Sequence, residues 1–285
     1  MDKSTIDFIT KRGVSKIIYE GEFVRLLNGG SPLRLKMGFD PSRPDIHLGH
    51  VVGLRKLRQL QNIGHQVILI VGDWTAQIGD PSGRSATRQM LTAEEVRENA
   101  ETYMTQFFKI VDRSRTQVVW QSEWFGKFTL ANVFDLTRRF TVAQFLARND
   151  FEKRFHAQQP IAITELLYPL LQAYDSVAIN SDVEFGGTDQ MFNILVGRDL
   201  QAMMGQTQQH CFIMPLLVGT DGVQKMSKSL GNYIGIDEKP EEMYEKFKLM
   251  TGSNYYNYST VTGQVLELSD IVSGNFILFS LSLIN

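Results

Sequence analysis

Two short motifs, far apart in the chain, carry side chains suited to binding phosphate. The first, His47-Leu48-Gly49-His50, stands where a helix is expected to begin after a strand. Free N–H groups and the positive end of the helix dipole attract phosphate there, and the two imidazoles add further donors. Gly49 leaves room for a flat base against the backbone. Average residue usage yields such a tetrapeptide by chance in roughly one chain of this length in a hundred, so alone it is weak support.

The second motif, Lys225-Met226-Ser227-Lys228-Ser229, lies between Gly222 and Gly231 after a predicted strand, which suits a mobile loop. A solvated run of charge is the ordinary interpretation of such a segment. That interpretation is weakened because the pentapeptide has a chance frequency on the order of 10⁻⁴ per chain of this length. A zinc site is disfavoured, because the H-E-x-x-H spacing is absent and the single cysteine is far away in sequence.

A third set of polar residues falls on one face of a predicted helix. Tyr168, Gln172 and Asp175 are spaced i, i+4 and i+7, and an apolar stripe of leucines and Tyr174 adjoins them. We expect the polar face to bind a ligand and the apolar stripe to pack, the alternative being a solvated polar face. Pro169 is expected to start or kink this helix.

The elements that must position these motifs alternate between strand and helix. A strand is expected at Leu33–Phe39, a helix at Gly49–Ile63, a strand at Gln66–Val71, a helix from Ala93 to about Val111, and a strand at Val118–Trp120. This order predicts an α/β fold, a Rossmann-like doubly wound parallel sheet with helices on both faces.

The second half of the chain is expected to complete that sheet after an insertion. Residues from Glu123 to about Thr164 read as inserted helices and as the natural dimer interface. A strand-like segment Val177–Ile179, a turn at Gly186 and Gly187, a helix from Asp189 to about Met203 and a strand Phe212–Val218 should follow. We expect a catalytic domain over residues 1–235, then a linker helix and an atypical tail over residues 236–285.

Composition places the chain among ordinary globular proteins. It has 285 residues, 43% hydrophobic and 21% charged, with a net charge of −2, which argues against disorder and coiled coil and means that any RNA contact must be local. The lone Cys211 has apolar neighbours and is expected to be a buried, inert thiol. Neither a secretory signal nor a membrane segment is evident, so the cytoplasm is the expected location.

Together, the two motifs resemble the HIGH and KMSKS signatures of the class I aminoacyl-tRNA synthetases. Gly38-Phe39-Asp40-Pro41 and Gly79-Asp80-Pro81-Ser82-Gly83 are similar to segments of the bacterial tyrosyl enzymes, and the likeness covers about residues 1–245. It implies that L-tyrosine attacks the α-phosphate of ATP and that the tyrosyl group then passes to tRNA(Tyr). Magnesium is expected to accompany ATP as a substrate complex, with no tightly bound cofactor and no metal site of the protein.

The resemblance also implies roles for individual residues. The expected catalytic residues, which stabilise charge at the phosphates, are His47, His50, Lys225, Lys228, Arg84 and Arg88. The expected ATP-binding residues are Asp40, His47, Gly49, His50, Gly187, Asp189 and Lys228. For tyrosine, Asp175 should accept the phenol O–H, Asp80, Tyr168 and Gln172 should hold the ammonium, and Gln190 should lie near the carboxylate.

Two departures from the family pattern bear on function. Lys36 stands where many tyrosyl enzymes have a tyrosine that contacts the substrate hydroxyl, so phenol recognition should rest more on Asp175. After about Glu245 the anticodon-binding and small RNA-binding domains of the family are not recognised, and we expect adenylation to outlast tRNA charging. Another adenylyl-transfer enzyme of the superfamily and a non-catalytic regulatory or RNA-associated fragment remain alternatives.

Overall fold

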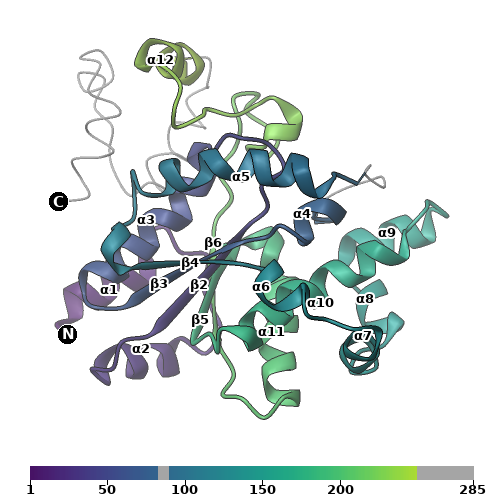
Figure 1. Ribbon diagram of the computed structural model, residues 1–285. Helices are drawn as coiled ribbons and strands as arrows, with labels where there is room; N and C mark the ends of the chain where they lie inside the picture. The colour runs from purple at the N-terminus through teal and green to yellow at the C-terminus, as the bar shows by residue number, and fades with distance from the viewer. Residues whose placement is uncertain (83–89, 249–285) are drawn as a thin grey trace.

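A computed structural model describes residues 1–82 and 90–248 (Figure 1). Arg84, Arg88 and the expected atypical tail after residue 250 therefore lie outside the described residues. Within the described ranges, six strands form one sheet in the order β1-β6-β5-β2-β3-β4. Their bounds are β1 Lys16–Ile17, β2 Arg34–Phe39, β3 Gln66–Val71, β4 Thr116–Trp120, β5 Val183–Gly187 and β6 His210–Met214.

The sheet is parallel except at one edge, where β1 pairs antiparallel with β6. Strand β3, which pairs with β2 on one side and β4 on the other, shows why these residues form a strand: five of its six residues are buried. Val67 and Leu69 pack into the core on one face, whereas Ile68 and Ile70 pack into the core on the other. Alternate side chains of a strand point to opposite faces, so an unbroken apolar run suits a strand covered on both sides.

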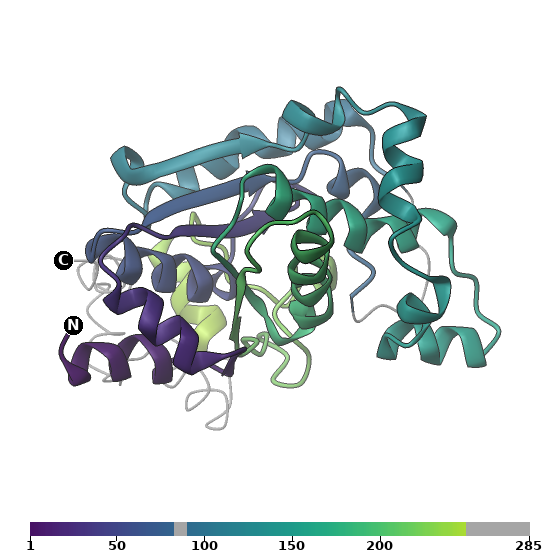
Figure 2. The same cartoon turned by 90° about the horizontal axis from the view of Figure 1, so that it is seen from below.

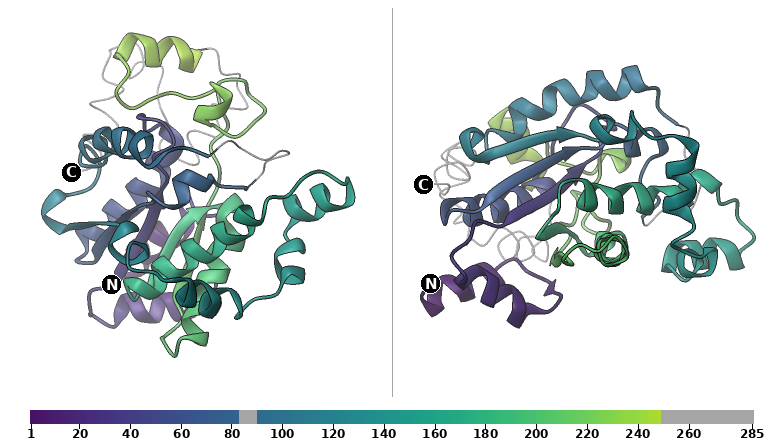
Figure 3. Two further views of the ribbon diagram at one scale, coloured as in Figure 1. Left: turned by 45° about the vertical axis from the view of Figure 1, so that its right-hand side comes forward. Right: turned by 60° about the horizontal axis from the view of Figure 1, so that its bottom comes forward.

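Helices cover both faces of the sheet (Figures 1 and 3). The core on the face of Val67 and Leu69 includes side chains of α1, α2, α3 and α5. On the face of Ile68 and Ile70, α10 and α11 contribute to the cores. This confirms the doubly wound α/β fold. The helix bounds on the body are α1 Lys3–Lys11, α2 Glu20–Asn28, α3 Leu48–Asn62, α4 Thr75–Ile78, α5 Ala93–Phe107, α10 Ile163–Ala178, α11 Met191–Met203 and α12 Pro240–Lys248.

Four short helices between β4 and α10 form the expected helical insertion. They are α6 Ser122–Phe125, α7 Leu130–Thr137, α8 Val142–Leu146 and α9 Asn149–His156. Figures 1 and 2 show α7, α8 and α9 projecting to one side of the sheet. Among these helices, α8 begins at a local cap, where the Thr141 hydroxyl accepts from the Gln144 N–H.

The expected strand Val177–Ile179 is wrong, because these residues end α10. A short apolar run rich in β-branched residues cannot be assigned to strand or helix by periodicity alone, and the long apolar stripe of α10 packed on α11 decides it here. The sheet strand in this region is β5, whose last residues are the glycines expected to form a turn.

Of the two outcomes expected for Pro169, a helix start is excluded, because the helix begins at Ile163 and continues through the proline; burial of the flanking turns outweighs the one lost N–H bond. One further expectation needs correction. The last strand, β6, ends at Met214 rather than Val218. Cys211 is buried and free, as expected, and burial raises the pKa of its thiol to about 12.

Candidate active site

A cavity of about 290 Å³ opens at the carboxyl end of the parallel strands. The chain passes from β2 to β3 and β4 on one side and through β5 and β6 on the other, so the strand order reverses between β2 and β5. Asp40 follows β2 and Gly187 ends β5, and both line the cavity. A crevice at such a reversal is where open α/β sheets bind ligands.

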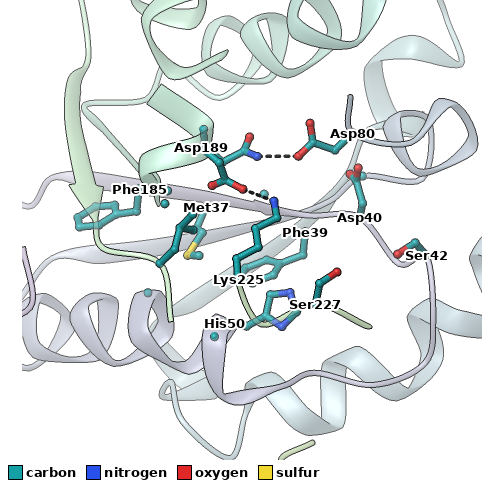
Figure 4. A pocket seen from close by; sticks show the side chains of 18 of the residues that line it. Met37, Phe39, Asp40, Ser42, His50, Asp80, Phe185, Asp189, Lys225 and Ser227 are labelled. Atoms are coloured by element: carbon teal, nitrogen blue, oxygen red, sulfur yellow. Dashed lines mark hydrogen bonds and ion pairs between the residues drawn. The ribbon is translucent and has the colours of Figure 1, made fainter. Parts of the chain in front are cut away.

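All the sequence-predicted site residues that the structure describes line this one cavity, whereas Arg84 and Arg88 lie outside the described residues. The cavity therefore joins segments that are more than 180 residues apart in the chain. Figure 4 shows side chains from both signature motifs and from the ends of β2 and β5 converging on it.

The first motif caps α3. The Nδ1 atom of His47 accepts the Gly49 N–H at 3.1 Å, and the Nδ1 atom of His50 accepts the His47 N–H at 3.2 Å. The two rings lie 3.9 Å apart. A Cβ on Gly49 would stand 2.9 Å from the His47 ring, so glycine leaves the room that the cap requires.

Both histidines are held neutral. Burial, with the nearby lysines Lys228 and Lys225, lowers the pKa of His47 to about 3. Burial also lowers the pKa of His50 well below its usual value, with the His47 ring and Lys228 adding to the effect. Because each Nδ1 accepts a backbone N–H, the proton of each neutral ring is assigned to Nε2. Each ring can therefore donate one hydrogen bond from Nε2 without carrying a full charge.

Both lysines of the second motif are engaged by protein oxygens. The Nζ atom of Lys225 lies 2.6 Å from Oδ2 of Asp189 (Figure 4), and Lys228 donates to the Tyr103 hydroxyl and to the Arg43 carbonyl. The glycine that ends this segment, Gly231, has φ of 69°, a conformation that glycine adopts without strain. The lysines could reach a phosphate only by exchanging these partners.

Asp40 lies between the two motifs and the residues expected to bind tyrosine. Its carboxyl accepts from the Thr75 hydroxyl at 2.7 Å and from the Tyr168 hydroxyl at 2.8 Å. Burial raises the pKa of this carboxyl to about 6 despite those hydrogen bonds. A Cβ on Gly72 would come within 2.3 Å of the carboxyl, so this glycine leaves the space that Asp40 occupies.

Asp175 is the most deeply held carboxyl of the cavity. It is 2% exposed and accepts from Gln121 Nε2 at 2.8 Å and from Trp124 Nε1 at 3.2 Å. Burial raises its pKa to about 8, against the lowering effects of Lys36 and the two donors. The Gln121 carbonyl accepts from the backbone N–H of Thr75, so its amide is oriented with the donors toward Asp175.

Lys36 does not line the cavity; its neighbour Met37 does. The Lys36 side chain is fully buried on the opposite face of β2, where Nζ lies 2.9 Å from Oε1 of Glu184 and donates to the backbone carbonyl of Gln172. The same Glu184 oxygen accepts from Gln172 Nε2 at 3.0 Å. The Gln172 side-chain amide is thereby oriented with its nitrogen toward Glu184. Its side-chain oxygen Oε1 is left to accept from a ligand.

The amide of Gln190 meets the carboxylate of Asp80 in the lining of the cavity. Gln190 Nε2 donates to Asp80 Oδ2 at 2.6 Å, and Figure 4 shows this bond ending on Asp80. The other Asp80 oxygen accepts the Ser82 N–H at 2.8 Å. Donors and acceptors thus alternate along the edge of the site expected to face an amino acid.

Sequence reasoning missed several residues that support the site. Gln121, Thr75 and Tyr103 contact the predicted residues, and Trp124 reaches Asp175 from the insertion. None stands in a motif, and Tyr103 lies on the buried periodic face of α5, where the sequence pattern indicates packing, so only the folded arrangement identifies them as site residues. Among residues 1–82 and 90–248, no three His, Cys, Asp or Glu side chains are grouped to hold a metal ion. No helix in those ranges is long and apolar enough to span a membrane.

Residues 28–270 match the family described as tRNA synthetases class I (W and Y). The tyrosine–tRNA ligase of Dehalococcoides mccartyi strain CBDB1 is 66% identical over 244 residues, which are 86% of this chain and 62% of that protein. The tyrosine–tRNA ligase of Carboxydothermus hydrogenoformans is 58% identical over 242 residues, 84% of this chain and 59% of that protein. The chain thus spans about three fifths of the length of these relatives.

Solved structures of the same kind share the fold. The tyrosyl-tRNA synthetase of Archaeoglobus fulgidus, determined with L-tyrosine, superposes with a TM-score of 0.75 at 23% identity, covering 99% of this chain and 98% of that one. A C-terminally truncated mitochondrial tyrosyl-tRNA synthetase of Aspergillus nidulans gives 0.76 at 20% identity, covering 99% and 87%. Family match and fold agree with the resemblance of the two signatures, and the chain belongs to the class I tRNA synthetases of the tryptophan and tyrosine family.

Proposed function

We propose that this chain activates L-tyrosine with ATP and passes the tyrosyl group to tRNA(Tyr). The observation that carries the proposal is the single cavity that joins the two histidines, the two motif lysines and the Asp175 face. The tyrosine–tRNA ligases that resemble the chain at 58–66% identity support tyrosine as the amino acid. The polar helix face of Tyr168, Gln172 and Asp175, which matches the tyrosyl enzymes, makes another adenylyl-transfer reaction a weaker alternative.

The first half-reaction needs positioning and charge stabilisation more than acid–base catalysis. A carboxylate oxygen of tyrosine attacks the α-phosphorus, the bond from that phosphorus to the bridging oxygen breaks, and pyrophosphate leaves with the electron pair. The attacking carboxylate is already ionised, so no proton is removed. Neutral His47 and His50 supply Nε2 donors, and Lys225 and Lys228 supply positive charge at the departing phosphates. Magnesium enters bound to ATP as part of the substrate.

The other end of the cavity selects the amino acid. Asp175 accepts the phenol O–H, Tyr168 and Asp80 lie with the Gln172 oxygen at the ammonium, and Gln190 faces the carboxylate. Asp189 and the backbone at Gly187 take the ribose, while Asp40 and Gly49 lie on the nucleotide side. Phenylalanine would leave the buried Asp175 carboxyl without its ligand donor, which carries a desolvation cost.

Tyrosine-dependent ATP–pyrophosphate exchange on the purified chain tests adenylation directly. We expect exchange with tyrosine and only background exchange with phenylalanine or without amino acid. Exchange with another amino acid but not with tyrosine would contradict the assignment, and no exchange with any amino acid would favour the non-catalytic alternative. Charging of tRNA(Tyr) on the same preparation tests the second half-reaction.

A homodimer through the helical insertion is also proposed. Leu130, Phe134 and Val142 are each more than half exposed, and so are Phe155 and Ile163. All lie on α7, α8, α9 or the start of α10, and large apolar side chains gathered on one surface are typical of an interface. Light scattering after gel filtration should give the mass of a dimer, and Leu130→Glu with Phe134→Glu should give a monomer. A monomeric parent chain would contradict the proposal.

A further inference from the structure

A closed ring of hydrogen bonds links the helical insertion to the amino-acid end of the cavity. Arg148, at the start of α9, donates from NH1 to Asn193 Oδ1 at 3.0 Å and from NH2 to the Ser82 hydroxyl. Asn193 Nδ2 donates to Gln190 Oε1 at 3.0 Å. Gln190 then donates to Asp80, whose second oxygen accepts the Ser82 N–H, which closes the ring.

The members of this ring are well buried where they lie away from the cavity. Arg148 is 6% exposed and Asn193 is fully buried, whereas Gln190 and Asp80 line the cavity itself. Asp150 holds the Arg148 Nε at 2.7 Å, and the guanidinium lies over the Phe192 ring. Arg148 therefore has one conformation in which its fork reaches α11 and the segment after α4 together.

The ring has a fixed direction. A guanidinium can only donate and a carboxylate can only accept, so the two amides between Arg148 and Asp80 have one orientation that satisfies both ends. Asn193 must turn its oxygen to Arg148 and its nitrogen to Gln190. Gln190 must then turn its oxygen to Asn193 and its nitrogen toward Asp80 and the cavity.

We propose that Arg148 is a positioning residue that makes Gln190 present N–H donors, rather than a carbonyl oxygen, to the carboxylate of the bound amino acid. This inference rests on the proposed function, which places the tyrosine carboxylate at Gln190. Without Arg148 the Asn193 amide can turn over, and the Gln190 side-chain oxygen then loses the Asn193 N–H donor that holds it away from the cavity. A carbonyl oxygen turned to the cavity would repel the substrate carboxylate.

The test compares tyrosine with tyramine, which has the phenol and the ammonium but no carboxylate. Dissociation constants of both are measured on the full chain by calorimetry. Arg148→Met should raise the dissociation constant of tyrosine about tenfold, the size expected for losing a hydrogen bond to a charged group. The constant for tyramine should change less than about twofold. Arg148→Lys, which keeps the charge without the fork, should give an intermediate loss.

A matched control comes from the same insertion helix. Arg154 is 2% exposed and pairs with Glu165 at 2.6 Å, away from the cavity lining. Arg154→Met should lower the melting temperature while leaving the ratio of the tyrosine and tyramine constants unchanged. In a double-mutant cycle, Arg148→Met should add no further loss of tyrosine affinity to Gln190→Ala, because both changes remove the same contact.

Asn193→Leu provides a second route if Arg148→Met does not fold. This substitution breaks the ring of hydrogen bonds between Arg148 and Gln190 and leaves the ion pair of Arg148 with Asp150 in place. It should reproduce the selective loss of tyrosine affinity. Equal losses for tyrosine and tyramine, or additive losses in the double mutant, would overturn the inference and make Arg148 a packing residue. If the unchanged chain bound tyrosine no better than tyramine, the proposed function would fail with it.

Discussion

The two ends of the cavity hold their polar side chains in different ways. At the phenol end, Asp175 is buried and keeps its partners Gln121 and Trp124, with room for one more donor. At the phosphate end, Lys225 is paired with Asp189, and Lys228 with Tyr103. A phenol can join the first arrangement as it stands, whereas a phosphate must replace partners in the second. The difference separates selection from catalysis, because an interaction made only as charge develops lowers the barrier.

The largest effect should come from removing a phosphate-end donor. His50→Ala or Lys228→Ala should lower kcat for tyrosine-dependent exchange about 10²–10³-fold, since each removes stabilisation of transition-state charge. The KM for tyrosine should stay within about twofold, because neither side chain belongs to the phenol end. Lys109→Met serves as control, since this lysine pairs with Asp237 at the surface. A KM for tyrosine that rises in step with the loss of kcat would erase the distinction between the ends.

The next effect concerns the phenol end. Asp175→Asn should lower the ratio of kcat/KM for tyrosine over phenylalanine about hundredfold, because the carboxyl that accepts the phenol O–H is replaced by an amide whose nitrogen cannot accept. Exchange assays with each amino acid measure the ratio, and the exposed Asp199→Asn is the control for loss of a carboxylate. An unchanged ratio would show that selection resides elsewhere in the cavity.

Much of the site is predictable from sequence, because many of its residues belong to short local motifs. The phosphate motifs and the spacing of Tyr168, Gln172 and Asp175 name residues that the structure brings to one cavity. The main strands β2 and β3 and the helix after β2 are also close to expectation. In those segments, periodicity and burial agree, so local patterns are enough.

The rest depends on contacts between distant segments. Lys36 could not be placed from sequence, because its buried pairing with Glu184 exists only once β2 and β5 lie side by side. Gln121 and Arg148 look like ordinary polar residues until the fold directs one to Asp175 and the other to Asn193. The misassigned strand at Val177–Ile179 has the same origin, since packing of α10 on α11 chose helix there.

The pH dependence of stability should distinguish the two ends again. Burial raises the pKa of Asp175 to about 8, so between about pH 4 and 8 the folded chain holds a proton there that the unfolded chain has released. Stability from this group is therefore full in acid and is lost as pH rises toward 8. The gain in unfolding free energy of Asp175→Asn over the parent chain should grow by at least about 1 kcal/mol across that range. Urea unfolding without ligand measures it.

At the phosphate end, His47 should give a pH dependence of stability with the opposite sign. The pKa of His47 is lowered to about 3, so below about pH 6.5 the unfolded chain takes up a proton that the folded chain refuses. Stability from the neutral ring is lost as pH falls through that window, and His47→Asn should flatten the loss. A gain for Asp175→Asn that stays constant from pH 4.5 to 8.5 would contradict the buried, protonated carboxyl at the other end.

The smallest effect on stability is expected for Lys225→Met. This variant tests whether Lys225 can exchange its partner Asp189 for a phosphate. The Lys225 and Asp189 side chains are 35% and 19% exposed, and a partly exposed ion pair contributes less than about 1 kcal/mol. Urea unfolding of Lys225→Met should therefore differ little from that of the parent chain, whereas Arg154→Met, which breaks a buried pair, should cost about 3 kcal/mol. The KM for ATP in exchange should nevertheless rise about fivefold, because the ammonium is lost from the phosphate end. A loss of several kcal/mol with an unchanged KM for ATP would mean that Lys225 holds the fold together, and that phosphate does not take it from Asp189.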